Sequence, residues 1–204
     1  VLDMCKKISD IRQKGAKELT KKLTQALMDL NFLDVKFDIQ IESSEDNITS
    51  KGYDTVTFMI STNPGELPRP LEKIASGGEL SRIMLAIKSV VADKDDISTL
   101  IFDEIDAGIS GKTAWKVSQK LGELAMGRQI ICITHLPQIA AMADNHFMIE
   151  KGLDEGRTVT RIYALSEEDS TKELSRLLGG EEITDATIQN ALDMRKMARE
   201  SKRI

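Results

Sequence analysis

The sequence has few of the residues that mark a secreted or membrane protein. It contains two cysteines, Cys5 and Cys132, which lie far apart and fit reduced, buried thiols better than a disulfide framework or a metal site. The two histidines, His135 and His146, lack the neighbouring cysteine or carboxylate pattern of a structural zinc site. No apolar run is long enough to span a bilayer and no signal peptide is visible. We therefore expect a cytoplasmic protein with no membrane partner.

The chain also lacks the positive charge that a surface binding DNA throughout would need. Its formal net charge is −5, which argues against such a surface. Basic residues gather only near the end, where the dipole of a helix favours cations at its C-terminus. We expect a solvated, stabilising face there, with DNA contact as the alternative. The cluster comprises Arg195, Lys196, Arg199, Lys202 and Arg203, with Asp193 and Glu200 nearby.

A complete phosphate-binding P-loop, G-x-x-x-x-G-K-[ST], is absent as well. The nearest segment ends in Gly111-Lys112-Thr113 but has Asp106 in place of the first glycine. An aspartate there would put a negative charge beside a phosphate and remove the permissive turn residue. We interpret residues 106–113 as a loop that follows an acidic strand, and this interpretation argues against a small P-loop kinase.

What is present first is a helix that begins at two glycines. Gly77 and Gly78 precede a run with helical three-and-four spacing, and the N-terminus of a helix attracts anions through its free amides and its dipole. The pattern predicts a phosphate-binding site. Ser76 and Glu79 also fit a capping box that only satisfies amides of its own helix. The apolar positions are Leu80, Ile83, Met84, Ile87, Val90 and Val91.

Two apolar strands follow, and each ends in side chains suited to nucleotide chemistry. Residues 98–102 lead to Asp103 and Glu104, and residues 130–134 lead to His135. Taken singly, the carboxylates fit a solvated strand end and the histidine fits a structural role. Their order after the phosphate-binding helix favours one half of a nucleotide-hydrolysing site.

These motifs resemble those of the ABC-type ATPases. The sequence Ser-Gly-Gly-Glu at 76–79 is similar to their signature motif, residues 100–104 to their Walker B strand, and residues 133–135 to their switch histidine. Within that superfamily the chain resembles the C-terminal part of the RecN family of bacterial DNA-repair proteins, which is related to SMC proteins. Ser110 stands where many ABC relatives have aspartate, and RecN-like sequences resemble the chain there. The close resemblance covers about residues 64–151 and rests on 73–88, 102–112 and 134–140.

The resemblance implies a role for each motif in hydrolysing ATP between two heads. Asp103 would help to hold Mg²⁺, Glu104 would act as general base towards water, and His135 would contact the γ-phosphate. A further set would face ATP held on the P-loop of the opposing head. This set comprises Ser76, Gly77, Gly78, Glu79, Ser110 and Gly111.

The resemblance also implies partners, because in RecN and SMC relatives the P-loop lies near the N-terminus, beyond a long coiled coil. We expect the chain to need the N-terminal P-loop half of its own polypeptide and a second head in a homodimer, and to be inactive alone. The full-length protein would bind DNA, in the nucleoid, during recombinational repair of double-strand breaks. One alternative is a head-like interaction module without catalysis, against which Glu104 and His135 argue. An ABC transporter subunit would usually carry a P-loop upstream, and residues 1–72 contain none.

The expected fold is α/β: the C-terminal half of an ABC-type ATPase head, with a largely parallel sheet, flanking helices and an N-terminal β-hairpin. We expect residues 1–31 to end a coiled-coil arm, with an ordinary packed helix as the alternative, and residues 32–204 to form the head lobe. The chain, 41% hydrophobic, can bury one sizeable core. The expected strands lie near 35–41, 56–60, 146–150 and 157–165, with a turn at 152–156, and the later helices near 111–125, 136–142, 170–178 and 184–201.

Overall fold

The computed structural model describes residues 1–94, 96–154, 157–180 and 182–202. The chain divides into two compact units, Val1–Asp96 and Ile97–Ile204. The first unit contains a long helix, a three-stranded sheet and a second helix. Its elements are α1 (Leu2–Asp29), β1 (Lys36–Ser43), η1 (Glu45–Asn47), β2 (Asp54–Ser61), β3 (Arg69–Pro70), η2 (Leu71–Lys73), α2 (Gly77–Val91) and η3 (Ala92–Lys94).

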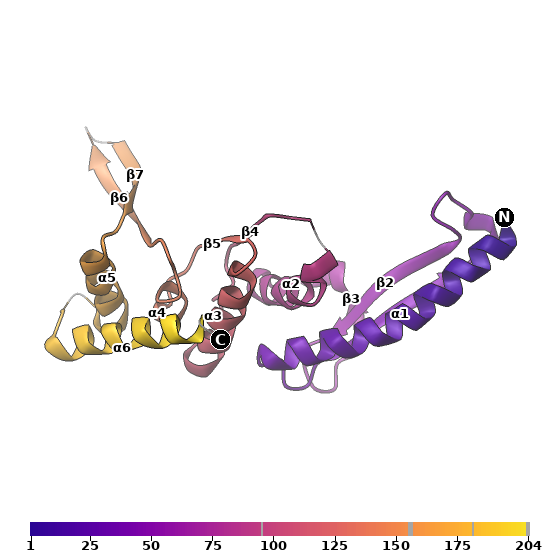
Figure 1. Cartoon of the computed structure of the whole chain (residues 1–204), viewed down its shortest axis with the longest axis horizontal. Helices are drawn as coiled ribbons and strands as arrows, with labels where there is room; N and C mark the ends of the chain where they lie inside the picture. Colours follow the sequence, from indigo (N-terminus) through magenta and orange to yellow (C-terminus); the bar gives the residue numbers. More distant parts are fainter. Residues whose placement is uncertain (95, 155–156, 181, 203–204) are drawn as a thin grey trace. The chain divides into compact units, whose positions relative to one another are not determined.

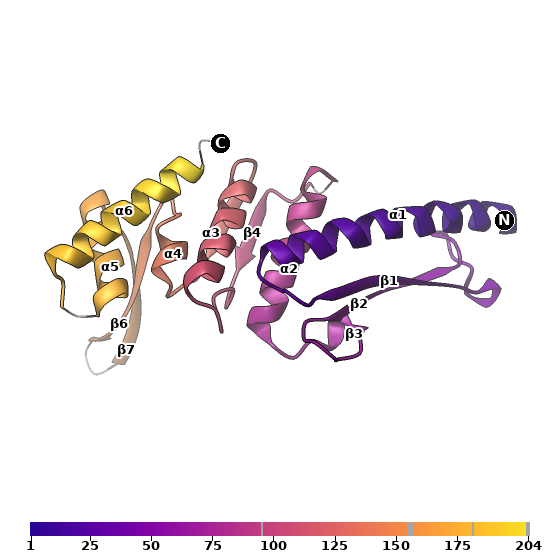
Figure 2. The same cartoon turned by 90° about the horizontal axis from the view of Figure 1, so that it is seen from below.

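The first unit is built on an antiparallel hairpin that lies along α1 (Figures 1 and 2). Strands β1 and β2 pair from Lys36 opposite Ser61 to Ser43 opposite Asp54, so the predicted hairpin with a long connecting loop is confirmed. The Arg12 guanidinium of α1 donates to Asp54 Oδ2 at 2.8 Å and to the Lys51 carbonyl at 2.7 Å. These bonds fasten the helix to the hairpin.

The far half of α1 has one buried face. Leu23 and Leu27 are completely enclosed, and α1 packs against both β1 and α2. At its N-terminal end, Leu2, Met4 and Ile11 are exposed. The proposed division into an arm segment 1–31 and a head lobe 32–204 concerns the complete protein and stays a prediction.

The second unit alternates strands with helices before it ends in two helices. Its elements are β4 (Thr99–Phe102), α3 (Gly111–Ala125), β5 (Gln129–Cys132), α4 (Pro137–Ala140), β6 (Phe147–Asp154), β7 (Arg157–Ala164), α5 (Glu167–Gly179) and α6 (Asp185–Ser201). Strands β4 and β5, joined through α3, are parallel, as a helical crossover requires. Within the described residues the other strand pairs are antiparallel. The α/β class is confirmed.

The predicted element boundaries hold best where the pattern is strongest. The helix expected near 111–125 is α3, with those bounds. Strand β6 runs to Asp154, further than expected, because its pairing with β7 continues to Arg157. The expected turn at 152–156 therefore falls partly on β6, and its residues 155 and 156 lie outside the described part of the chain.

The helices of the second unit share a small apolar core. It is formed by Ala140, Ala141, Met142, Leu174, Ala191, Met194 and Ala198. At the surface, Arg195 and Arg199 of α6 both form ion pairs with Glu167 of α5, and Lys202 lies 2.6 Å from Asp144. These pairs agree with the expected stabilising role of the basic cluster. Its member Arg203 lies outside the described residues. No described helix has the length and apolar character needed to cross a membrane.

Candidate functional site

Helix α2 begins at the glycine pair, and Ser76 is its N-cap. The Ser76 hydroxyl accepts a hydrogen bond from the Glu79 amide at 3.4 Å, so the helix-capping alternative describes a real contact. Ser76 and Gly77 are exposed, whereas Gly78 is buried. A capping serine remains compatible with anion binding, because its hydroxyl accepts from the Glu79 amide alone and the first turn of a helix has further amides without intrahelical partners.

A buried arginine anchors this helix inside the first unit. Arg82 is 7% exposed, and its guanidinium lies 5.6 Å from the centre of the Phe32 ring, just beyond the end of α1. Burial lowers the pKa of Arg82, and the nearby Glu79 carboxylate opposes that effect. The contact couples the position of the Ser76 turn to the end of α1.

The carboxyl ends of β4 and β5 bring most of the other predicted residues to one edge. Phe102 is opposite Cys132 in the parallel register, and the Ile133 amide donates to the Phe102 carbonyl at 3.0 Å. Asp103 and Glu104 thus leave β4 beside the segment that leads to His135. Both carboxylates and the imidazole are exposed.

Glu104 has an unusual backbone conformation. Its φ is 55°, a left-handed value that is uncommon outside glycine and costs about 1–3 kcal/mol when it is maintained. The Glu104 amide donates to Asp103 Oδ1 at 2.9 Å, and the Ala107 amide donates to the Glu104 carbonyl at 3.0 Å. These bonds hold a strained turn at a position where the sequence predicts a catalytic carboxylate.

Asp106 is the residue whose contacts at this edge sequence reasoning did not predict. Its side chain is buried, and its Oδ2 accepts hydrogen bonds from the Thr134 hydroxyl at 2.6 Å and from the His135 amide at 2.8 Å. His135 Nδ1 lies 3.0 Å from the same oxygen. In the sequence Asp106 only breaks a P-loop pattern. The one local signal is its neighbour Ile105, an apolar residue in a polar loop, which the structure buries fully.

The loop from Asp106 to α3 contains the two remaining predicted residues. Ser110 is the N-cap of α3 and Gly111 its first residue, and both are exposed. Gly108 and Gly111 have φ values of 74° and 50°, which favour glycine. The Asp106 carboxylate at the start of this loop accepts hydrogen bonds from Thr134 and His135, and the interpretation of residues 106–113 as a loop other than a P-loop stays a prediction.

Cys132, at the end of β5, is a partly buried thiol whose pKa is affected by these carboxylates. Burial raises the pKa of its thiol to about 12, with further contributions from the charges of Asp106 and Asp103. The thiol therefore stays protonated at neutral pH. Cys5 and Cys132 are both free thiols, Cys5 buried and Cys132 partly buried.

The carboxylates fit a partial magnesium site. Among the described residues, no three His, Cys, Asp or Glu side chains gather as a metal-binding group. Mg²⁺ is commonly bound through one or two carboxylates, with water and substrate phosphates completing its shell. Asp103, exposed at the end of β4, fits a single ligand of that kind.

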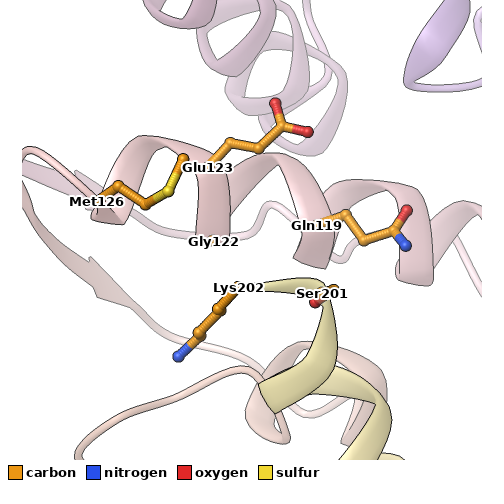
Figure 3. Close-up of a pocket in the computed structure, with 6 residues that line it drawn as sticks. All are labelled: Gln119, Gly122, Glu123, Met126, Ser201 and Lys202. Carbon is orange, nitrogen blue, oxygen red and sulfur yellow. The ribbon is translucent and has the colours of Figure 1, made fainter. Parts of the chain in front are cut away.

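Two surface features complete the second unit. A cavity of about 320 Å³ lies between α3 and the end of α6 (Figure 3), and none of the predicted site residues lines it.

The parallel strands of the second unit have exposed isoleucines. On β4, Ile101 is 68% exposed although Leu100 and Phe102 are buried. Ile131 on β5 and Ile133 just after it are also exposed. Within the described part of the second unit, one face of this parallel sheet therefore carries exposed isoleucines, whereas parallel sheets are normally covered on both faces.

Comparison with known proteins identifies similar DNA-repair proteins. The chain is 41% identical over 205 residues to the DNA repair protein RecN of Bacillus subtilis, covering 94% of this chain and 36% of that protein. It is 42% identical over 188 residues to RecN of Vibrio cholerae, covering 92% of this chain and 34% of that protein. The chain therefore spans about a third of the length of these relatives. The predicted likeness to the C-terminal part of RecN is confirmed. No protein-family model matches the chain.

Solved structures with the same fold are heads of SMC proteins. The Smc head domain with a coiled coil and joint from Pyrococcus yayanosii aligns with a TM-score of 0.58 at 23% identity, covering 81% of this chain and 30% of that chain. The Smc head domain from Pyrococcus furiosus, with an extended coiled coil and bound to the C-terminal domain of ScpA, gives 0.55 at 22% identity, covering 82% and 39%. At these identities the comparison shows the fold, and the expected head-type α/β fold is confirmed.

Proposed function

We propose, from its likeness to the C-terminal part of RecN, that this chain forms the C-terminal half of an SMC-like ATPase head. The full-length protein would hydrolyse ATP during recombinational repair of DNA double-strand breaks in the bacterial cytoplasm, at the nucleoid. The observation that carries this proposal is the sheet edge where Glu104 leaves β4 beside the His135 segment, tied together through Asp106.

Each residue at this edge has a chemical task in the proposed reaction. Glu104 would accept a proton from the attacking water, and the strained turn at this residue supports a fixed direction for the carboxylate. His135 would contact the γ-phosphate of the nucleotide. Asp103 would hold Mg²⁺, which when bound neutralises charge that develops on the phosphates.

The other predicted residues would act on nucleotide held by a partner head. Amides at the start of α2 and α3 are suited to a phosphate oxygen, since both helices begin at exposed glycines. ATP would be bound between two heads, and hydrolysis would release them. This set is Ser76, Gly77, Gly78, Glu79, Ser110 and Gly111.

The bare surfaces support the proposed partners within the polypeptide. We infer that the N-terminal P-loop half covers the exposed isoleucines Ile101, Ile131 and Ile133, because an uncovered parallel sheet is unusual. We also infer that Leu2, Met4 and Ile11 at the start of α1 contact a second helix of a coiled-coil arm. DNA would bind the assembled protein.

The proposal is tested by replacing the base in the full-length protein. Glu104→Gln keeps shape and hydrogen bonding but cannot take a proton, so ATP turnover should fall at least about 100-fold. Head dimers bound to ATP should then accumulate. The matched control is Glu123→Gln, since Glu123 is an exposed carboxylate near the other end of α3 whose partner is Lys120. Wild-type turnover in Glu104→Gln would contradict the proposal and favour a head-like module without this base.

A further inference from the structure

We propose that Asp106 is a positioning residue that fixes the ring of His135, with the proton on Nδ1 and with Nε2 presented outward to the ligand. This inference rests on the proposed function, in which His135 contacts the γ-phosphate, and it adds the residue that sets how the imidazole makes that contact. It is drawn from the contacts at the ends of β4 and β5.

The geometry centres on a single carboxylate oxygen. Asp106 Oδ2 accepts from the Thr134 hydroxyl at 2.6 Å and from the His135 amide at 2.8 Å, and it lies 3.0 Å from His135 Nδ1. Backbone and ring of the same histidine are therefore held by one atom that belongs to a different loop, 29 residues earlier. Neither the segment nor the ring can turn without breaking at least one of these contacts.

The two side chains of this pair differ strongly in burial. The Asp106 side chain is 5% exposed, whereas the His135 side chain is 72% exposed. The ring thus has Nδ1 against a buried carboxylate, while most of the side chain is exposed to solvent. The carboxylate orients the ring, and the exposed part of the ring can contact a ligand.

Thr134 removes the remaining freedom of the segment. Its hydroxyl donates to Asp106 and also accepts from the Leu136 amide at 3.0 Å. The hydroxyl is therefore used both as a donor and as an acceptor. Leu136 is the N-cap of α4. The backbone from the end of β5 to the start of α4 is consequently held around the Asp106 carboxylate.

The chemistry of the pair determines which nitrogen carries the proton. An ionised carboxylate only accepts hydrogen bonds, and a bare Nδ1 lone pair 3.0 Å from it would be repelled, so we infer that Nδ1 carries the proton. This holds whether the ring is neutral or positively charged, and Nε2 is in either case the nitrogen that a ligand meets. Carboxylates orient histidines that bind metal ions in the same way, and loss of such a partner typically weakens function about 10–100-fold.

The backbone of Asp106 also belongs to the loop that precedes α3. The Ile109 amide donates to the Asp106 carbonyl at 3.3 Å, so the turn that leads to Ser110 and Gly111 starts at this residue. A substitution that removes the Asp106 carboxylate is therefore expected to disturb the ring of His135 and to keep the backbone bond to Ile109.

The test reads the proton position directly, by ¹⁵N NMR of the histidine side chains in the chain itself. His135 and His146 are its two histidines, and His146→Gln assigns the spectrum. In spectra recorded at pH 8, wild-type His135 should show a protonated Nδ1. Asp106→Ala should shift it to the form protonated on Nε2 that predominates in exposed histidines.

Two further variants keep the experiment decisive. Asp144→Ala removes an exposed aspartate whose partner is Lys202, so it is the matched control and should leave the His135 signals unchanged. Thr134→Val removes the hydroxyl but keeps the carboxylate beside the ring, so Nδ1 should stay protonated. If Asp106→Ala does not fold, the wild-type and Thr134→Val spectra still decide. An Nε2-protonated His135 in wild type, or unchanged signals in a folded Asp106→Ala, would overturn the proposal.

Turnover of the full-length protein separates this inference from the function on which it rests. Asp106→Ala should lower kcat about 10–100-fold with little change in KM for ATP, and Asp144→Ala should not. If the proton shifts to Nε2 while turnover is unchanged, Asp106 positions the ring but His135 is dispensable, which contradicts its role in the proposed function. A fall in turnover without a shifted proton would overturn the inference about Asp106 alone.

Discussion

Substitutions of Ser76 can distinguish between two roles of this residue. It either only caps helix α2 or also contacts a nucleotide bound to a partner head. Its hydroxyl caps α2 through one long hydrogen bond of 3.4 Å to the Glu79 amide, and the residue is exposed. Removing an N-cap hydroxyl costs about 0.5–2 kcal/mol, and the long bond places Ser76→Ala near about 0.5 kcal/mol. For a chain of this size that corresponds to a fall in Tm of about 1–2 °C.

The chain offers a matched control at another helix. Ser166 is the N-cap of α5 and accepts from the Asp169 amide at 3.1 Å. Its shorter bond predicts that Ser166→Ala costs about 1 kcal/mol, somewhat more than Ser76→Ala. Thermal unfolding followed by circular dichroism compares the two capping roles directly.

Arginine at the same two positions tests the nucleotide role. In the full-length protein Ser76→Arg should block ATP-dependent dimerisation, because its side chain would occupy the approach of the partner's phosphate, while each head still binds ATP. Ser166→Arg should dimerise normally. The assay is sedimentation velocity with and without a non-hydrolysable ATP analogue. Equal dimerisation of Ser76→Arg and wild type would refute the reasoning and leave Ser76 as a helix cap.

Three further predictions concern the chain by itself. Arg12→Ala should lower the free energy of unfolding in urea by about 1–3 kcal/mol, because it leaves the enclosed Asp54 carboxylate without its guanidinium; Lys22→Ala, in an exposed pair with Glu18, should change it little. Burial lowers the pKa of His146, opposed by Glu173 and assisted by Arg195, so stability should fall as pH drops below about 6.5, and His146→Gln should flatten that dependence in urea titrations at pH 7.5 and 5.5. Calorimetry with Mg-ATP should detect no micromolar binding by this chain, and such binding would revive residues 106–113 as a P-loop.

Local patterns were sufficient for much of the fold. The strand expected near 35–41 is β1, the helix expected at the glycine pair is α2, and the helix expected near 111–125 is α3. These elements follow from nearest-neighbour spacing, which a sequence displays directly. The boundary of β6 was predicted less well, because its length is set by cross-strand pairing with β7.

Contacts between distant residues could not be predicted. Asp106 binds Thr134, 28 residues later, and Arg82 stacks on Phe32 across a hairpin. Both charged residues are buried, which is unusual for charged side chains. No local sequence pattern predicts this burial. The strained φ of Glu104 is likewise a result of the assembled strand ends. The candidate site was therefore predictable as a set of residue types, and its internal geometry required the structure.

We expect this chain to supply the acidic half of an ATPase site and to require a P-loop from the rest of the polypeptide. The most direct test is the steady-state rate of ATP hydrolysis by this chain, by the separate N-terminal half, and by their equimolar mixture. We expect hydrolysis only in the mixture, and its loss when the chain carries Glu104→Gln. Hydrolysis by this chain alone at the rate of the mixture would show that it needs no P-loop from the rest of the polypeptide.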